Sequence, residues 1–438
     1  INEDLKKGWK YYLEEAEQEE EVKKQLEAIR TEYSQLKPGD IKVIDPCMGS
    51  GHILVYAFEV LMQIYESYGY SQRDAAKSII ENNIFGLDID KRAYQLAYFA
   101  VMMKARAYNR RILSSGVKCN LYAIQESNGI NREHLEYFGS NLSPVERQTA
   151  IEEITEILDT MKDAREYGSI IDVKLFNKEL LERFLEGHSA HEQMSFETVG
   201  IESTHEKLVE LIKIAYVMAQ KYEIVITNPP YMGASGMGVK LSEYVKKNYA
   251  DSKSDLFAVF IERCGEMNIK NGYQAMITQH SWMFLSSYEK LRNNLLLQDT
   301  INMIHLGARA FEEIGGEVVQ TSSWVSRKNN FREYKGTYCR LIEQATQQSK
   351  EDMFLSRKGR YTTKQVNFSK ISGSPIAYWV SEAITKSFEE GIKLSKICET
   401  KKGIATSDNN RFLRLWHEIN LNKIGFNYGS NEETDRKS

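Results

Sequence analysis

The sequence lacks the features of secreted, disulfide-bonded and membrane-spanning proteins. Its five cysteines are widely separated and include no C-x-x-C pair, which argues against a disulfide framework and against a structural zinc site. No apolar run approaches the roughly 20 residues that a membrane span requires, because the best candidate, residues 53–62, contains Glu59. No secretory signal is visible. We therefore expect a protein of the reducing cytoplasm, without a metal site and without a membrane contact.

A strong excess of one charge is also missing. The net charge is −4 over 438 residues, which does not mark the whole chain as a nucleic-acid binder. The charge is nevertheless uneven, because 21 lysines and arginines face 13 acidic residues between Gln320 and Ser438. A basic last third is compatible with contacts to phosphates, although from charge alone a solvated surface is the preferred interpretation.

The hydrophobic pattern predicts a Rossmann-like α/β fold with a doubly wound sheet. The length favours two or three domains. After an N-terminal helical segment, three short apolar strands alternate with two amphipathic helices. This β-α-β-α-β order is typical of a parallel sheet with helices on both faces. We expect the strands at 41–44, 84–87 and 117–124, and the helices at about 52–68 and 92–108.

A polar and helical sequence over about 127–220 interrupts this alternation, and we interpret it as an insertion between two strands. The alternation resumes with strands at 223–227 and 273–278, followed by an apparent antiparallel pair at 301–306 and 318–325. Beyond residue 328 the sequence becomes more basic and irregular. The expected domains are a helical segment at 1–37, an α/β domain at 38–328 and a mixed α/β region at 329–438.

A glycine turn directly follows the first expected strand and opens the next helix. Glycines permit a tight turn and the close approach of a ligand to the backbone, and the helix offers unpaired N–H groups. A phosphate would suit this place, but the acidic residue at the strand end would repel it and suits a cation such as the ammonium of a methionine moiety. An ordinary strand-to-helix turn is the alternative. The motif consists of Asp45, Pro46, Cys47, Met48, Gly49, Ser50 and Gly51.

A second acidic motif, residues 85–90 (FGLDID), lies at the end of the second expected strand. A carboxylate at this position can accept hydrogen bonds from ribose hydroxyls. We expect this role for Asp88, packing of Ile89 on an adenine face, and capping of the following helix by Asp90. The two motifs together, at this spacing, predict a nucleoside site.

A third motif follows the apolar strand at 223–227 and comprises Asn228, Pro229, Pro230 and Tyr231. Two prolines fix the backbone, so the Asn228 side chain and the Pro229 carbonyl can accept both hydrogens of one aromatic amino group. Such hydrogen bonds help a poorly nucleophilic nitrogen to become tetrahedral. Tyr231 offers a stacking surface for a base that leaves the double helix. A rigid loop after a strand is the alternative.

The three motifs in this order resemble the DNA amino-methyltransferases of the gamma arrangement, over about residues 41–328. Within that class, the first motif and the long helical insertion resemble the adenine methyltransferases of BREX phage-defence systems. The resemblance implies S-adenosylmethionine as cofactor. It assigns the methionine part to residues 45–51, the ribose to Asp88 and the adenine to Ile89.

The same resemblance implies further site residues. Glu126, after the third strand, would contact the base of the cofactor. Asn228, Pro229, Pro230 and Tyr231 would form the catalytic pocket, with Asn228 also beside the cofactor. Phe311 resembles the second aromatic residue that encloses a flipped base, although core packing between strands explains it nearly as well. Two departures are the missing Thr-Pro element upstream and the insertion between the cofactor and catalytic motifs.

The expected activity is site-specific methylation of adenine N6 in double-stranded DNA, with the adenine flipped out. The region at 329–438 would begin a target-recognition domain, and other subunits of a restriction or phage-defence system would be further partners. One alternative is a protein methyltransferase acting on glutamine amides, which uses the same tetrapeptide. Another is a non-catalytic subunit that binds the cofactor and DNA within a defence complex.

Overall fold

The structure, a computed structural model, describes residues 3–187, 200–310, 319–392, 394–398, 413, 415–420 and 422. The chain divides into two compact units, Ile1–Phe388 and Glu389–Ser438. The described residues of the second unit include short 3-10 turns at Leu394–Lys396 and Trp416–Glu418. Within the described ranges, no helix is both long and apolar enough to cross a membrane.

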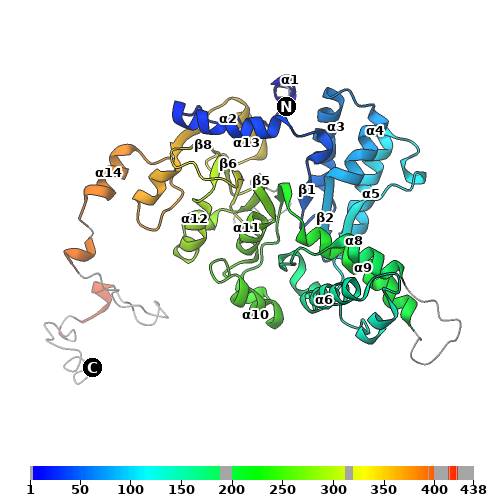
Figure 1. Ribbon diagram of the computed structural model, residues 1–438. Coiled ribbons are helices and arrows are strands. Elements are labelled where there is room, and N and C mark those ends of the chain that lie inside the picture. Colours follow the sequence, from blue (N-terminus) through cyan, green and yellow to red (C-terminus); the bar gives the residue numbers. More distant parts are fainter. Residues whose placement is uncertain are drawn as a thin grey trace. The chain divides into compact units, whose positions relative to one another are not determined.

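A nine-stranded sheet forms the centre of the first unit, in the order β3-β2-β1-β4-β5-β7-β6-β8-β9 (Figure 1). The first five strands in chain order pair in parallel, whereas β7 is antiparallel to both of its neighbours, β5 and β6. The predicted doubly wound α/β class is therefore confirmed. The strands of this part are β1 (Val43–Asp45), β2 (Ile84–Asp88), β3 (Asn120–Ala123), β4 (Tyr222–Thr227), β5 (Asn268–Gln279), β6 (Asp299–Gly307) and β7 (Thr321–Arg327).

Apolar residues on both faces of the central strands explain why helices pack on both faces of the sheet. Val43 and Ile44 are adjacent in β1 and belong to different hydrophobic clusters, as the alternation of side chains along a strand requires. Helices α3 (His52–Ser67), α4 (Gln72–Ser78) and α5 (Lys91–Tyr108) pack in the cluster of Val43. Helix α11 (Leu256–Met267) and the insertion pack in the cluster of Ile44.

The insertion between β3 and β4 is helical in its described part, as predicted. Its elements are η4 (Arg132–Tyr137), α6 (Pro144–Thr160), α7 (Ala164–Tyr167), η5 (Gly168–Ile170), α8 (Lys178–Glu186) and α9 (Ile201–Ala219). It also contacts α10 (Val239–Asn248), where the rings of Tyr167 and Tyr244 stack with centroids 4.5 Å apart. The insertion is thereby fixed to the segment that follows the Asn-Pro-Pro-Tyr loop.

The sheet continues beyond residue 328, where the sequence pattern led us to expect a domain boundary. Strand β8 (Lys335–Arg340) pairs in parallel with β6, and β9 (Arg360–Lys364) pairs antiparallel with β8. Helix α13 (Gln347–Leu355) connects these two strands, and α12 (Glu289–Leu295) precedes β6. The first compact unit therefore extends to Phe388, into α14 (Glu382–Glu390).

The N-terminal segment packs on the far half of the same sheet. It contains α1 (Glu3–Gly8) and α2 (Glu20–Ser34), with non-helical residues between them. Leu13 from this connection joins Cys339 and Phe354 in one apolar cluster, and Leu26 of α2 joins Tyr334 in another. Because Ile301 of β6 belongs to the cluster of Leu26, and Cys339 of β8 to that of Leu13, the segment at 1–37 packs against strands on both sides of residue 328.

Candidate active site

The three sequence motifs meet at one edge of the sheet, because β2, β1 and β4 are adjacent and parallel. Asp45 and Asp88 are the last residues of β1 and β2, and Thr227 ends β4 just before Asn228. The Thr227 hydroxyl donates a hydrogen bond of 2.7 Å to Asp45 Oδ1. The predicted cofactor motif is therefore in direct contact with the residue that precedes the predicted catalytic motif.

Backbone hydrogen bonds fix the glycine turn after β1. The Met48 N–H donates to the Leu87 carbonyl at 3.0 Å, and the Gly49 N–H donates to Asp88 Oδ2 at 2.9 Å. Gly49 has φ +52°, and a Cβ there would meet open space. Gly51 has φ +83°, and a Cβ there would lie 2.9 Å from the Ala97 Cα of α5. Glycine is favoured at both places because φ is positive there. At Gly51 the absence of a side chain also allows the turn to approach α5 closely.

Asp45 is 1% exposed and one of its oxygens has no partner. Its Oδ1 accepts from Thr227 and from the Cys47 N–H at 3.0 Å, whereas Oδ2 is buried without a hydrogen bond. The pKa of this carboxyl is raised to about 7, mainly by burial and to a smaller extent by the nearby charge of Asp88, against the opposing effect of the two hydrogen bonds. A buried carboxylate of this kind favours a cationic partner.

Asp88 lies half-buried with both carboxylate oxygens directed to backbone N–H groups. Oδ2 accepts from Gly49, and Oδ1 accepts from Asp90 at 2.8 Å. Each oxygen retains capacity for one more donor. Asp90 caps α5 by accepting from the Arg92 N–H, as predicted.

Ile89 and Glu126 lie near Asp88 on neighbouring segments. Ile89 is 56% exposed, and the insertion residue Gly168 is so close that a Cβ there would lie 3.0 Å from the Ile89 Cγ2. The Ile124 N–H donates to the Asp88 carbonyl at 2.8 Å. Glu126, which is half-buried, follows Ile124 by two residues in the sequence. Predicted residues from β2 and β3 therefore line the same edge.

The Asn-Pro-Pro-Tyr loop presents an amide oxygen and an aromatic ring. Asn228 is exposed, and Tyr231 is half-buried with its hydroxyl 3.2 Å from Asn228 Oδ1 and 3.3 Å from the Ile277 carbonyl oxygen. The Tyr231 ring makes an edge contact with Phe257, with centroids 6.1 Å apart. Burial raises the pKa of Tyr231, so its hydroxyl stays protonated and can donate.

Pro229 is buried and Pro230 is exposed, so the first proline anchors the loop. Asp255 holds the other end: its Oδ1 accepts from the Met232 N–H at 3.0 Å and from the Phe257 N–H at 3.3 Å. Burial raises the pKa of Asp255, while the backbone N–H groups oppose that shift. The loop is thereby attached to the N-terminus of α11.

Several residues of the site were not predicted from the sequence. Ser169 in the insertion donates to the Pro46 carbonyl at 2.6 Å, and the buried Arg263 guanidinium donates to the Ser169 carbonyl at 3.4 Å. Thr227 and Asp255 were also missed. Ser169 and Asp255 lie outside the motifs and act through tertiary contacts, although Asp255 before an apolar helix has the pattern of an N-cap.

Phe311, expected as the second aromatic residue of the pocket, lies outside the described residues. Within the ranges that the structure describes, no group of three histidine, cysteine or acidic side chains is placed to hold a metal ion. All five cysteines are free thiols.

Comparisons with known proteins give the family. The model of the Eco57I restriction-modification methylases matches residues 82–311, more than half of the chain, and that of the N-6 DNA methylases matches residues 24–118. The chain is 41% identical over 429 residues to the adenine-specific methyltransferase PglX of Lacticaseibacillus casei (strain Zhang), covering 96% of this chain and 34% of PglX. It is 40% identical over 440 residues to the adenine-specific methyltransferase BrxX of Escherichia coli O9:H4 (strain HS), covering 96% and 36%.

The chain thus spans about a third of the length of these two relatives. Among solved structures, the Type ISP restriction-modification enzyme LlaGI in complex with a DNA substrate mimic aligns with a TM-score of 0.45 at 13% identity, over 75% of this chain and 24% of the other. The predicted resemblance to adenine methyltransferases is confirmed by the family models and the two relatives. The chain belongs to the family of Eco57I restriction-modification methylases.

Proposed function

We propose that this chain transfers a methyl group from S-adenosylmethionine to N6 of a flipped adenine in double-stranded DNA, within a restriction or phage-defence system. The observation that carries the proposal is the hydrogen bond that joins the end of β4, directly before the Asn-Pro-Pro-Tyr loop, to Asp45 of the glycine turn. Thr227 bonds to Asp45, so the exposed Asn228 begins its loop directly beside the glycine turn. The printed names of PglX and BrxX, both adenine-specific methyltransferases, favour adenine as the target.

The residues at the edge fit S-adenosylmethionine. Asp45 Oδ2 is a buried acceptor without a partner, which suits the ammonium of the methionine part. The open space in front of Gly49 gives the loop room to receive a ligand, and Asp88 can accept from ribose hydroxyls. Ile89 would flank the adenine ring, with Pro46, Met48 and Glu126 beside it. The bound cofactor supplies an electrophilic methyl group on its sulfonium.

Asn228 and Pro229 would activate the amino group of the target base. The Asn228 amide oxygen and the Pro229 carbonyl accept its two hydrogens, so the nitrogen lone pair turns out of the ring plane toward the methyl group. The Tyr231 hydroxyl, 3.2 Å from Asn228 Oδ1, holds that oxygen in the loop. Alignment of the reacting atoms supplies much of the rate enhancement.

Tyr231 would hold the flipped base by stacking, which contributes about 1–3 kcal/mol per base in comparable sites. Its edge contact with Phe257 and the anchoring of Pro229 fix the ring before DNA arrives. Pro230 gives the loop its second rigid position, and Phe311 remains the predicted second aromatic residue. With this function, the chain would act in the cytoplasm. The region at 329–438 would begin a target-recognition domain, and other subunits of the defence system would be partners.

The test is methyl transfer by the purified chain in the context of its full-length protein. Unmethylated DNA and a total protein extract are incubated separately with S-adenosylmethionine carrying a labelled methyl group. We expect label in N6-methyladenine after digestion of the DNA, and none after Asn228→Ala. Label in glutamine of the extract alone would favour the protein methyltransferase. Retained DNA binding without any transfer by the wild type would favour a non-catalytic subunit.

A further inference from the structure

A cavity of about 260 Å³ lies at the edge of the sheet opposite to the cofactor motifs. Lys42 precedes β1, Phe85 is the second residue of β2, and Asn120 is the first of β3, so these residues line it at the amino ends of the strands. Asp45 and Asp88 end the same strands on the other side. Since β2 has five residues, the two edges are separated by about 13 Å at 3.3 Å per residue. A ligand here would not occupy the cofactor position.

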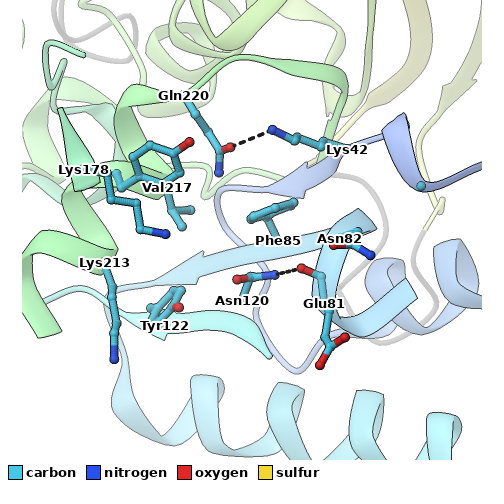
Figure 2. Close-up of a pocket in the computed structure, with 12 residues that line it drawn as sticks. Lys42, Glu81, Asn82, Phe85, Asn120, Tyr122, Lys178, Lys213, Val217 and Gln220 are labelled. Atoms are coloured by element: carbon cyan, nitrogen blue, oxygen red, sulfur yellow. Dashed lines mark hydrogen bonds between the residues drawn. The ribbon is translucent and has the colours of Figure 1, made fainter. Parts of the chain in front are cut away.

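The second wall of the cavity comes from the insertion. Lys178 begins α8, while Lys213, Tyr216 and Val217 lie on α9. Figure 2 shows Lys178 directed from α8 toward the strand residues Phe85 and Tyr122. The cavity is therefore a half-open cleft between the sheet and two helices.

The lining carries an excess of positive charge. Three lysines line the cavity against one acidic residue, Glu81. Lys42 Nζ contacts the amide oxygen of Gln220 at 3.3 Å, and Lys178 Nζ is 3.7 Å from Glu182 in its own helix. Among the described residues, neither Lys42 nor Lys213 forms an ion pair. These ammonium groups can therefore bind an anion without breaking strong pairs.

Aromatic rings and amides lie between the lysines. Lys178 Nζ is 4.7 Å from the centre of the Tyr216 ring, and Tyr122 and Phe85 contribute two further rings. The Asn120 amide nitrogen donates to the Glu81 carbonyl at 2.9 Å, which leaves the amide oxygen as an acceptor (Figure 2). Rings of this kind stack on bases, and a polar amide can hydrogen-bond a base edge.

We propose that this cavity binds a nucleoside phosphate at a site separate from the methyl donor. Lys178 and Lys213, from the neighbouring helices α8 and α9, would contact the phosphates, while Tyr122 and Tyr216 would contact the base. The site does not depend on methyl transfer.

The test is calorimetric titration of ATP, as the probe, into the full-length protein saturated with S-adenosylhomocysteine. We expect binding, and a rise in Kd of roughly tenfold for Lys178→Ala and for Lys213→Ala, because one charge-assisted contact is lost in each. The matched control is Lys207→Ala, an exposed lysine of α9 outside the cavity. It should leave Kd unchanged, and thermal unfolding should show that all three variants fold.

A second variant tests the base contact. Tyr216→Leu should weaken ATP about fivefold or more, while leaving tripolyphosphate binding unchanged. The proposal is overturned if ATP gives no binding, if S-adenosylhomocysteine displaces ATP, or if Lys207→Ala weakens ATP as much as Lys178→Ala does. Equal affinity for tripolyphosphate and ATP would show a simple anion site and would also contradict it.

Discussion

Asp45 is a buried carboxyl group in which one oxygen has no hydrogen-bond partner. Burial raises its pKa to about 7 from an ordinary value of 3.8, so the folded protein holds a proton that the unfolded chain releases. The contribution of Asp45 to stability is therefore greatest below pH 3.8 and is lost as the pH rises to about 7. A cationic ligand reverses this preference, because it favours the ionised carboxylate.

We therefore predict that the affinity for S-adenosylmethionine rises as the pH rises through about 7. The Asp45→Asn variant keeps an oxygen for Thr227 but cannot ionise, so the increase should disappear and affinity at pH 8 should fall roughly tenfold. Calorimetric titration between pH 6 and 8 measures both. Because the ligand amine also titrates, the comparison of the variant with the wild type isolates the carboxyl. Identical pH profiles would contradict a contact between Asp45 and the ammonium.

Tyr231 separates two contributions, its ring and its hydroxyl. Tyr231→Phe keeps the stacking surface and removes only the hydroxyl contacts to Asn228 Oδ1 and the Ile277 carbonyl, so the KM for DNA should change less than about threefold. Tyr231→Ala removes the ring and should cost about 1–3 kcal/mol, or roughly fivefold to 150-fold in kcat/KM for DNA. Steady-state kinetics, with the KM for S-adenosylmethionine as control, tests this. Equal losses in both variants would argue against stacking.

At the scale of elements, the pairing of β6 with β7 contains a buried ion pair. Arg327 Nη2 lies 2.7 Å from Asp299 Oδ2, with 2% and 1% of the side chains exposed. Arg327→Met would leave the Asp299 charge buried, and we predict a loss of about 3–5 kcal/mol in the free energy of unfolding. The double variant Asp299→Leu with Arg327→Met should recover part of it. Urea unfolding measures the cycle, and additive losses would show that the pair is not coupled.

The Ser169 hydroxyl of the insertion contacts the glycine turn after β1. Ser169 donates to the Pro46 carbonyl at 2.6 Å, so Ser169→Ala leaves a buried carbonyl without this donor. We predict that the Kd for S-adenosylmethionine rises about fivefold, the equivalent of about 1 kcal/mol, while kcat stays within twofold. Ser140→Ala, which removes a hydroxyl elsewhere in the insertion, is the control. If both variants behave alike, the insertion does not position the turn.

Elements with a strong local signal could be predicted from the sequence. The strands β1, β2 and β4 and the helices α3 and α5 follow hydrophobic periodicity and lie within a few residues of their predicted bounds. Strands β8 and β9 could not be predicted, because their pairing joins distant segments and their polar composition indicated a new domain. The motif residues could be predicted because they are close together in the sequence. Ser169 could not, because it contacts Pro46 from 123 residues away.

At the scale of the whole molecule, the far half of the sheet depends on segments from both sides of the methyltransferase motifs. Gln18 accepts from the Lys335 N–H and donates to its carbonyl, and Glu14 pairs with Arg360 of β9 at 2.7 Å. The N-terminal segment therefore belongs to the same compact unit as β8 and β9. Part of the region at 329–438 thus completes the sheet. A role of this region in target recognition stays a prediction.

The most direct test of the proposed activity is modified-base sequencing of DNA from cells that carry the full-length gene, as wild type and as Asn228→Ala. We predict N6-methyladenine at one defined sequence in the wild type, and its complete loss in the variant. A second set of cells, which also carries the neighbouring genes, tests whether partner subunits are required. If neither set of cells contains the modified base at a defined sequence, the chain does not methylate adenine in DNA.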